Sequence, residues 1–331
     1  MGIQLSLIAV VGLIAVAFLG VKAAGLAYLF GVVVPYAAIG LFLGGFIYKM
    51  LKWASAPVPF RIPTTAGQQM SLPWIRQAKL DNPSSKAGVV GRMLLEVLLF
   101  RSLFRNTKVE LRDGPKIAYQ WEKWLWLAAL LFHYSFFVIV VRHLRLFTEP
   151  VPFFVTGIEQ LDGFLQVGLP GIYMSDAAFL LAVTYLFIRR IVIPQVRYIS
   201  LPADYFPLFL LMAIGVTGVL TRYFTKVDII KVKQLAMSLV TFNPVAPAGI
   251  GVIFYIHLFL VCTLLAYFPF SKLMHLGGVF LSPTRNLPND SRIIRHVNPW
   301  NYPVKVHTYA EYEDHFREKM IEAGLPVEKE S

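Results

Sequence analysis

Histidines within apolar segments are the residues of this sequence best suited to chemistry. Four of its seven histidines, His133, His143, His257 and His275, lie in or just beyond two long apolar runs. Ionisable side chains are costly in hydrocarbon and are usually kept there for function. A lone histidine is often only a packing residue, but two pairs on two segments favour a shared role. Imidazoles can supply both axial ligands of a haem iron.

The spacing of the histidines gives their geometry. His143 follows His133 by 10 residues, a helical rise of about 15 Å with a rotation about 80° from alignment. His275 follows His257 by 18 residues, so both share one face if the helix continues. Two facing helices would then hold two haems. Because 18 helical residues rise about 27 Å, the unequal spacings require tilted haems or a kink near Pro269.

Zinc is the alternative metal for these histidines. Zinc sites favour closely spaced histidines with carboxylate or thiolate ligands, and neither run has an Asp or Glu near its histidines. The single cysteine, Cys262, excludes a cysteine-ligated iron–sulfur cluster. No C-x-x-C-H motif is present to attach a c-type haem. The sequence therefore favours two b-type haems.

The elements that position the histidines are long apolar runs. The chain has 331 residues, of which 56% are hydrophobic, which is rare in soluble proteins. About 20 apolar residues span a hydrocarbon core of about 30 Å. Runs of this kind lie at about 5–21, 26–51, 124–141, 177–193, 205–220 and 250–268. We predict an all-α integral membrane protein, a bundle of about six transmembrane helices.

Polar segments divide the chain into four parts. They are an N-terminal transmembrane hairpin (1–52), a cytoplasmic linker (53–123), a di-haem four-helix membrane domain (124–280) and a cytoplasmic C-terminal tail (281–331). The tail is too polar for a membrane, and we expect it to order on a cytoplasmic subunit. We expect its histidines to be surface or interface residues: His296, His307 and His315.

The linker contains one predicted helix. Its start is predicted to be extended because Pro57, Pro59 and Pro63 follow one another closely. Residues 89–105 then interleave apolar residues with charges at helical spacing. This pattern predicts an amphipathic helix on the membrane surface. The alternative is a helix docked on a partner.

Charge orients the bundle in the cytoplasmic membrane. Residues 52–123 hold 12 basic and 5 acidic residues, and the loop 142–175 holds 2 basic and 3 acidic residues. The positive-inside rule places the first segment, and with six helices both termini, in the cytoplasm. The loop 221–247 is basic yet lies outside in this topology. The sequence contains no basic motif interleaved with aromatic residues, so nucleic-acid binding is not predicted.

Helix direction then sets the histidine pairing. The run at 124–141 leads outward and the run at 250–268 leads inward. His143 and His257 therefore form the predicted outer pair, and His133 and His275 the inner pair.

Longer stretches resemble a known family. The chain resembles the gamma subunits of respiratory nitrate reductase, a family of cytochrome b subunits. The features that match are the two histidine spacings, residues 268–272 (FPFSK) and residues 194–197 (PQVR). A closer resemblance is to the DsrM family of DsrMKJOP complexes, from sulfate reducers and sulfur oxidisers. It rests on residues 198–209 (YISLPADYFPLF), 223–228 (YFTKVD), 280–288 (FLSPTRNLP) and 296–307 (HVNPWNYPVKVH).

The resemblance implies a multi-pass electron-transfer subunit with two b haems. It carries the haem-ligand role onto the four histidines named above. Menaquinol or menaquinone would react near the outer haem, and electrons would pass to or from a DsrK-like iron–sulfur partner. The nitrate reductase family has a lysine at its quinol site, whereas no lysine occurs here between Lys123 and Lys226.

Charged residues at the outer end are candidates for the quinol chemistry, which needs a proton acceptor and a cation or donor. Besides His143, they are Arg142, Arg145, Glu159 and Asp162. The two arginines could instead bind haem propionates, and the two acids could be solvated loop charges.

Two other functions remain open, a transporter subunit and a membrane anchor without a redox role. A transporter predicts charges or broken helices near the bilayer midplane, and the six runs show few. An anchor would leave the four histidines without a purpose.

Overall fold

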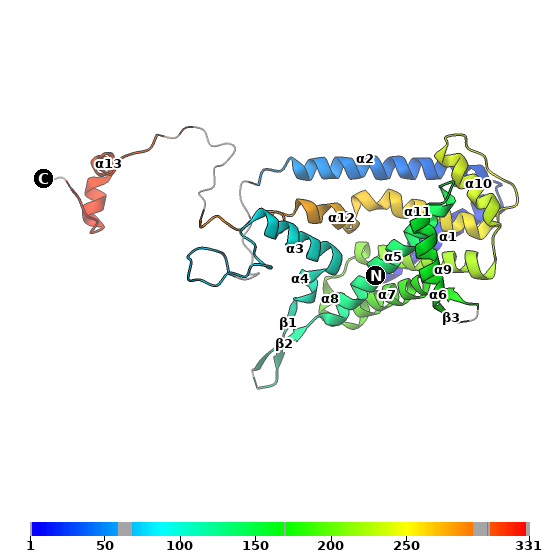
Figure 1. Ribbon diagram of the computed structural model, residues 1–331, viewed down its shortest axis with the longest axis horizontal. Helices are drawn as coiled ribbons and strands as arrows, with labels where there is room; N and C mark the ends of the chain where they lie inside the picture. Colours follow the sequence, from blue (N-terminus) through cyan, green and yellow to red (C-terminus); the bar gives the residue numbers. More distant parts are fainter. Residues whose placement is uncertain are drawn as a thin grey trace.

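A computed structural model describes residues 2–58, 68–114, 116–168, 170–293, 303 and 305–328. Its main body is a bundle of long helices (Figure 1). They are α1 (Gly2–Lys22), α2 (Val34–Ala54), α5 (Lys123–His143), α7 (Met174–Val192), α9 (Pro202–Val219) and α11 (Val252–Tyr267). Each of the six predicted apolar runs forms one of these helices, and the predicted all-α membrane fold is confirmed.

Five helical segments are long and apolar enough to cross a membrane among the described residues: Gly2–Lys22, Leu29–Ala54, Lys123–Leu146, Pro202–Phe224 and Val252–Phe270. Helix α7 has 19 residues, with Asp176 in its first turn and Arg189 and Arg190 in its last. Because such a helix is about 28 Å long, its charges lie near the two faces of a bilayer. The chain is a multi-pass membrane protein.

The helices share one core. Helix α5 packs on α7, α7 on α9, and α1 on both α9 and α11, while α2 lies along α11. Val10 and Phe30 from the N-terminal segment are buried in the same cluster as Leu210 and Leu260. The first two helices therefore pack into the bundle that carries the histidines.

The loops after α5 and α9 meet at one end of the bundle, at the right of Figure 1. This end also holds η2 (Leu144–Leu146), α6 (Phe153–Phe164), the short strands β3 (Gln166–Val167) and β4 (Ile172–Tyr173), η3 (Leu220–Phe224) and α10 (Ile229–Val240). Lys233 pairs with Glu149, and Arg222 with Glu159 at 3.4 Å. The basic residues of the second loop thus meet acidic residues of the first, which accounts for their place on the predicted outer side.

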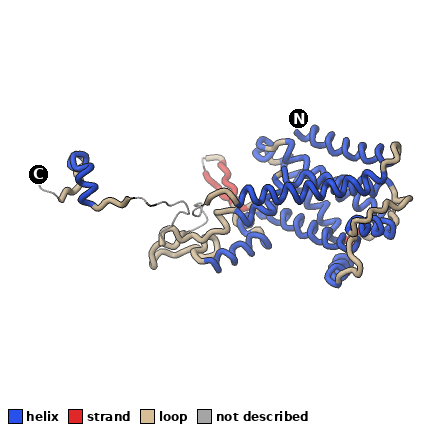
Figure 2. Tube along the Cα trace, turned by 90° about the horizontal axis from the view of Figure 1, so that it is seen from above, coloured by secondary structure: helices blue, strands red, loops and turns tan. Residues whose placement is uncertain are grey.

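The linker lies at the opposite end of the bundle. The predicted helix is present as α3 (Lys86–Leu99) and α4 (Arg101–Phe104), divided by Phe100, whose φ of 49° is left-handed. An antiparallel hairpin follows, β1 (Thr107–Arg112) with β2 (Lys116–Trp121), and Figure 2 shows it in red. This hairpin was not predicted from the sequence. Pro59 and Pro63 lie outside the described residues.

The beginning of the tail packs on the linker. Arg285 pairs with Glu96 at 3.2 Å, and Arg92 donates to the Thr284 carbonyl at 3.2 Å. Further along, α13 (Tyr309–Glu322) begins with a capping box. His307 precedes this helix and His315 lies within it, with their ring centroids 5.8 Å apart, and His296 is outside the described residues.

Cysteine labelling tests which end faces the cytoplasm. Gln160 and Asn243 are exposed at one end, Asp113 is exposed in the hairpin turn, and the native Cys262 is buried. In intact cells a membrane-impermeant maleimide should label Gln160→Cys and Asn243→Cys, but Asp113→Cys only after permeabilisation, because charge places the linker inside. Labelling of Asp113→Cys in intact cells would show that the linker faces the outside and that the predicted topology is wrong.

Candidate functional site

Helix α5 fixes the rotation of its two histidines through its own backbone. The Nδ1–H group of His133 donates to the Ala129 carbonyl at 2.7 Å, and that of His143 to the Ile139 carbonyl at 2.7 Å. These carbonyls lie one turn earlier, toward which helical side chains lean. Each imidazole therefore presents its Nε2 atom away from the helix.

The chain segment that carries the other two histidines is not one helix. Helix α11 ends at Tyr267, and two 3₁₀ turns, Phe268–Phe270 and Lys272–Met274, precede the short α12 (His275–Gly278). Pro269 has no amide hydrogen to continue the helix, and Ser271 is extended. The expected kink near Pro269 is thus a full break, and the alignment of His257 with His275 on one helical face does not apply.

The break brings the histidines together in the two predicted pairs. The ring centroids of His143 and His257 lie 6.5 Å apart with planes at 22°, and those of His133 and His275 lie 6.0 Å apart at 82°. A metal–imidazole bond is about 2 Å, so two trans ligands place their ring centroids roughly 6 Å apart. Both pairs have the separation of axial ligands on opposite sides of one metal.

The remaining two imidazoles are also oriented through Nδ1. His275 donates to the Lys272 carbonyl at 2.9 Å. Thr217 donates its hydroxyl to the Ala213 carbonyl at 2.7 Å, so its oxygen accepts from Nδ1 of His257 at 3.0 Å. A hydrogen bond to the Nδ1 atom of an imidazole leaves the Nε2 atom to bind a metal.

Small and aromatic residues shape the two pairs. A Cβ atom on Gly218 would lie 3.2 Å from Cε1 of His257, so glycine lets α9 approach this imidazole closely. Phe100 and Phe132 contact His133 edge to face, with centroids at 4.9 and 5.0 Å. Phe100, whose backbone is in the left-handed region, thus brings the linker into contact with the inner pair.

The donor set fits haem better than zinc. The described part of the chain has no group of three or more His, Cys, Asp or Glu that could hold a metal ion. Each pair provides two nitrogen ligands, which suffices for an iron whose other ligands belong to a macrocycle. A structural zinc site needs four protein ligands.

A buried ion cluster lies next to His143. Arg142, only 4% exposed, bonds Asp162 at 2.5 Å, Ser175 at 2.8 Å and Asp176 at 3.2 Å. Tyr223 donates its hydroxyl to Asp176 at 2.6 Å. Arg142 and Asp162 were candidate site residues from sequence. Asp176 and Tyr223 were not, although an acid in the first turn of an apolar helix was a usable signal.

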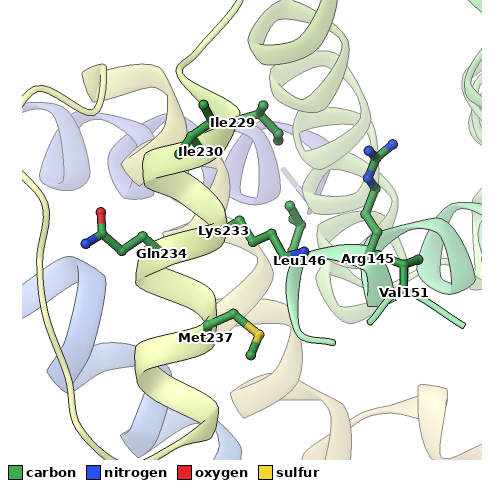
Figure 3. A pocket seen from close by; sticks show the side chains of 8 residues that line it. All are labelled: Arg145, Leu146, Val151, Ile229, Ile230, Lys233, Gln234 and Met237. Atoms are coloured by element: carbon green, nitrogen blue, oxygen red, sulfur yellow. The ribbon is translucent and has the colours of Figure 1, made fainter. Parts of the chain in front are cut away.

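The other two candidates stand at the edge of this cluster. Glu159 pairs with both Arg145 and Arg222. Arg145 also borders a cavity of about 330 Å³ between η2 and α10 (Figure 3). The lining residues are Arg145, Leu146, Val151, Ile229, Ile230, Lys233, Gln234 and Met237.

A helical membrane bundle with two facing histidine pairs defines a membrane protein of the cytochrome b-like class. Residues 117–296 match the family model described as nitrate reductase gamma subunit. The chain belongs to this family.

Two archaeal relatives carry a more specific name, Hdr-like menaquinol oxidoreductase cytochrome b-like subunit. The protein of Archaeoglobus fulgidus is 48% identical over 280 residues, covering 82% of this chain and 83% of the relative. That of Archaeoglobus profundus is 47% identical over 274 residues, covering 81% of each. The resemblance found in the sequence is confirmed, and the matches are consistent with a DsrM-type subunit.

Removing one member of the buried ion cluster should destabilise the protein. Asp162→Ala leaves Arg142 short of one counter-charge, which costs roughly 3–5 kcal/mol at a buried pair. The free energy of unfolding in mixed micelles measures the loss. Lys108→Ala breaks a hairpin pair with Glu110 at 3.0 Å and should cost less than about 1 kcal/mol, as exposed pairs do. Equal losses would show that the cluster contributes no more than a surface pair.

Proposed function

We propose that this chain is a membrane cytochrome b subunit that binds two b haems and exchanges electrons between menaquinol or menaquinone and a cytoplasmic partner. The observation that carries this proposal is the pair of histidine contacts, 6.5 Å and 6.0 Å between ring centroids, with every Nδ1 bonded elsewhere. The printed names of the Archaeoglobus relatives support the menaquinol substrate.

The residues of each pair have distinct tasks. His143 and His257 would hold the outer haem, and His133 and His275 would hold the inner haem. Thr217 and the carbonyls of Ala129, Ile139 and Lys272 hold these rings in place. A bound haem supplies one-electron transfer at its iron.

The cavity beside η2 is the proposed site of the quinol ring. Its volume of about 330 Å³ lies at the small end of the range for ligand pockets. Arg145, Lys233 and Gln234 provide hydrogen-bond donors to the ring oxygens, while Glu159, paired with Arg145, accepts a proton.

The partner at the inner end is proposed to be a DsrK-like iron–sulfur subunit of a DsrMKJOP-like complex, in dissimilatory sulfur metabolism. The resemblance of residues 198–209 and 280–288 supports this assignment. Phe100 of the linker contacts His133 of the inner pair, so we expect electrons to be exchanged with the partner where α3 and α4 cover the bundle. The tail orders on the same partner.

Haem content tests the proposal directly. The purified full chain should contain two low-spin b haems per protein by its reduced-minus-oxidised spectrum and by haem extraction. His143→Ala and His133→Ala should each lose one haem, because one axial ligand is missing, while His307→Ala in the tail should keep both. A wild-type protein without haem b would favour an anchor or transporter subunit without a redox role.

The hydroxyl beside His257 should matter for haem retention. Thr217→Val keeps the side-chain shape but removes the acceptor for Nδ1. Loss of a group that hydrogen-bonds a metal-binding imidazole typically lowers metal affinity about 10- to 100-fold. Transfer of haem to excess apomyoglobin should be faster from this variant, and only from the outer site. Thr263→Val is the matched control, since among the described residues the Thr263 hydroxyl bonds the Phe259 carbonyl, at 2.8 Å, and no histidine. Equal transfer rates from the two variants would contradict the role of Thr217.

A further inference from the structure

Four charged groups are packed beside the outer histidine pair. Arg142 and Asp162 are each 4% exposed, and the side chain of Asp176 is 12% exposed. The guanidinium carbons of Arg142 and Arg222 both lie 4.4 Å from the ring centroid of Tyr173. The group holds two positive and two negative charges, so its net charge is zero only while all four are ionised.

The charges are close to both outer histidines. Arg142 immediately precedes His143 on α5, Asp176 pairs with Arg142 at 3.2 Å, and Arg222 lies against the same Tyr173 ring as Arg142. Arg222 follows Gly218 by four residues on the helical continuation of α9, about one turn, and Gly218 lies against His257. An iron held between these imidazoles would therefore lie within electrostatic reach of these charges.

Stability alone does not explain this arrangement. Buried ion pairs contribute little net stability compared with apolar residues of the same volume. Within the described part of the chain, the buried Nε of Arg142 also has no hydrogen-bond partner, which is costly. The cluster retains full charges at a place where they act on the proposed outer haem.

The sign of each effect follows from electrostatics. Reduction adds one negative charge to the iron, so a nearby carboxylate disfavours the reduced form and a nearby guanidinium favours it. The net charge around a redox centre is one of the factors that set its potential. A tenfold change in the reduced-to-oxidised ratio equals about 59 mV for a one-electron couple.

We propose that the cluster of Arg142, Asp162, Asp176 and Arg222 sets the reduction potential of the outer haem, with Asp176 lowering it and Arg222 raising it. This inference rests on the proposed function. Tyr173, between the two guanidinium groups, and Tyr223, bonded to Asp176, hold the charges in position. The outer haem thereby has a potential separate from that of the inner haem, although both have two histidine ligands.

A redox titration of the purified full chain tests the proposal. The absorbance that is lost in His143→Ala identifies the outer haem. Asp176→Asn should raise the potential of the outer haem by about 59 mV, a tenfold change in the reduced-to-oxidised ratio, and Arg222→Gln should lower it by a similar amount. The double variant should return close to the wild-type value, because the charges balance again. The potential of the inner haem should stay constant throughout.

Controls separate a charge effect from a structural one. Glu149→Gln removes one negative charge at the same end of the bundle, but this side chain is 64% exposed, and screening by solvent should leave the potential unchanged. Tyr223→Phe keeps the charge of Asp176 and should move the potential less than Asp176→Asn. Structural damage alone would move the potential of Asp176→Asn and Arg222→Gln in the same direction.

The outcomes that overturn the proposal are distinct. Shifts no larger than that of Glu149→Gln, or shifts of the same sign in both charge variants, would refute it. If Asp176→Asn fails to fold, Arg222→Gln decides alone, because Arg222 has a side chain that is 40% exposed; its potential must then fall. A wild-type chain without haem b would instead refute the proposed function.

Discussion

A polar atom in the hydrocarbon interior has no water to bond, so each one needs a partner within the protein. The four histidines satisfy this constraint at one nitrogen only, through a carbonyl or a hydroxyl one turn away or on the next helix. The four rings come together in two pairs, with ring centroids 6.5 and 6.0 Å apart. The same constraint explains why Arg142 gathers carboxylate and hydroxyl groups from α6 and α7.

The break after α11 lets His257 and His275 meet the two histidines of α5, although the spacings of the two pairs along the chain differ. A continuous helix would place His275 about 27 Å from His257, whereas His133 and His143 are about 15 Å apart on α5. The 3₁₀ turns change the chain direction between Pro269 and His275, and Lys272 ties this corner to Asp204 at 2.6 Å. The cost of interrupting the helix is limited because the break lies at its end, near the polar face of the membrane.

Much of this architecture follows from sequence. Apolar runs of bilayer length predicted all six long helices, and charge bias with helix direction predicted which histidines meet. Other features depend on contacts that no local pattern records. The hairpin of β1 and β2, α10 and α13 are short or amphipathic elements within segments interpreted as polar. Asp176 and Tyr223 come from separate helices, so their approach to Arg142 needed the three-dimensional packing.

The two histidine pairs differ in the angle between their imidazole planes, 22° for the outer pair and 82° for the inner pair. On a haem iron, each axial imidazole donates π density along a direction set by its own plane. Nearly parallel planes act on the same iron d orbital, whereas nearly perpendicular planes act equally on two. If each pair held a haem, the two centres would have different magnetic anisotropy despite identical ligands, and the three carbonyls and the Thr217 hydroxyl that hold the rings would determine which centre is which.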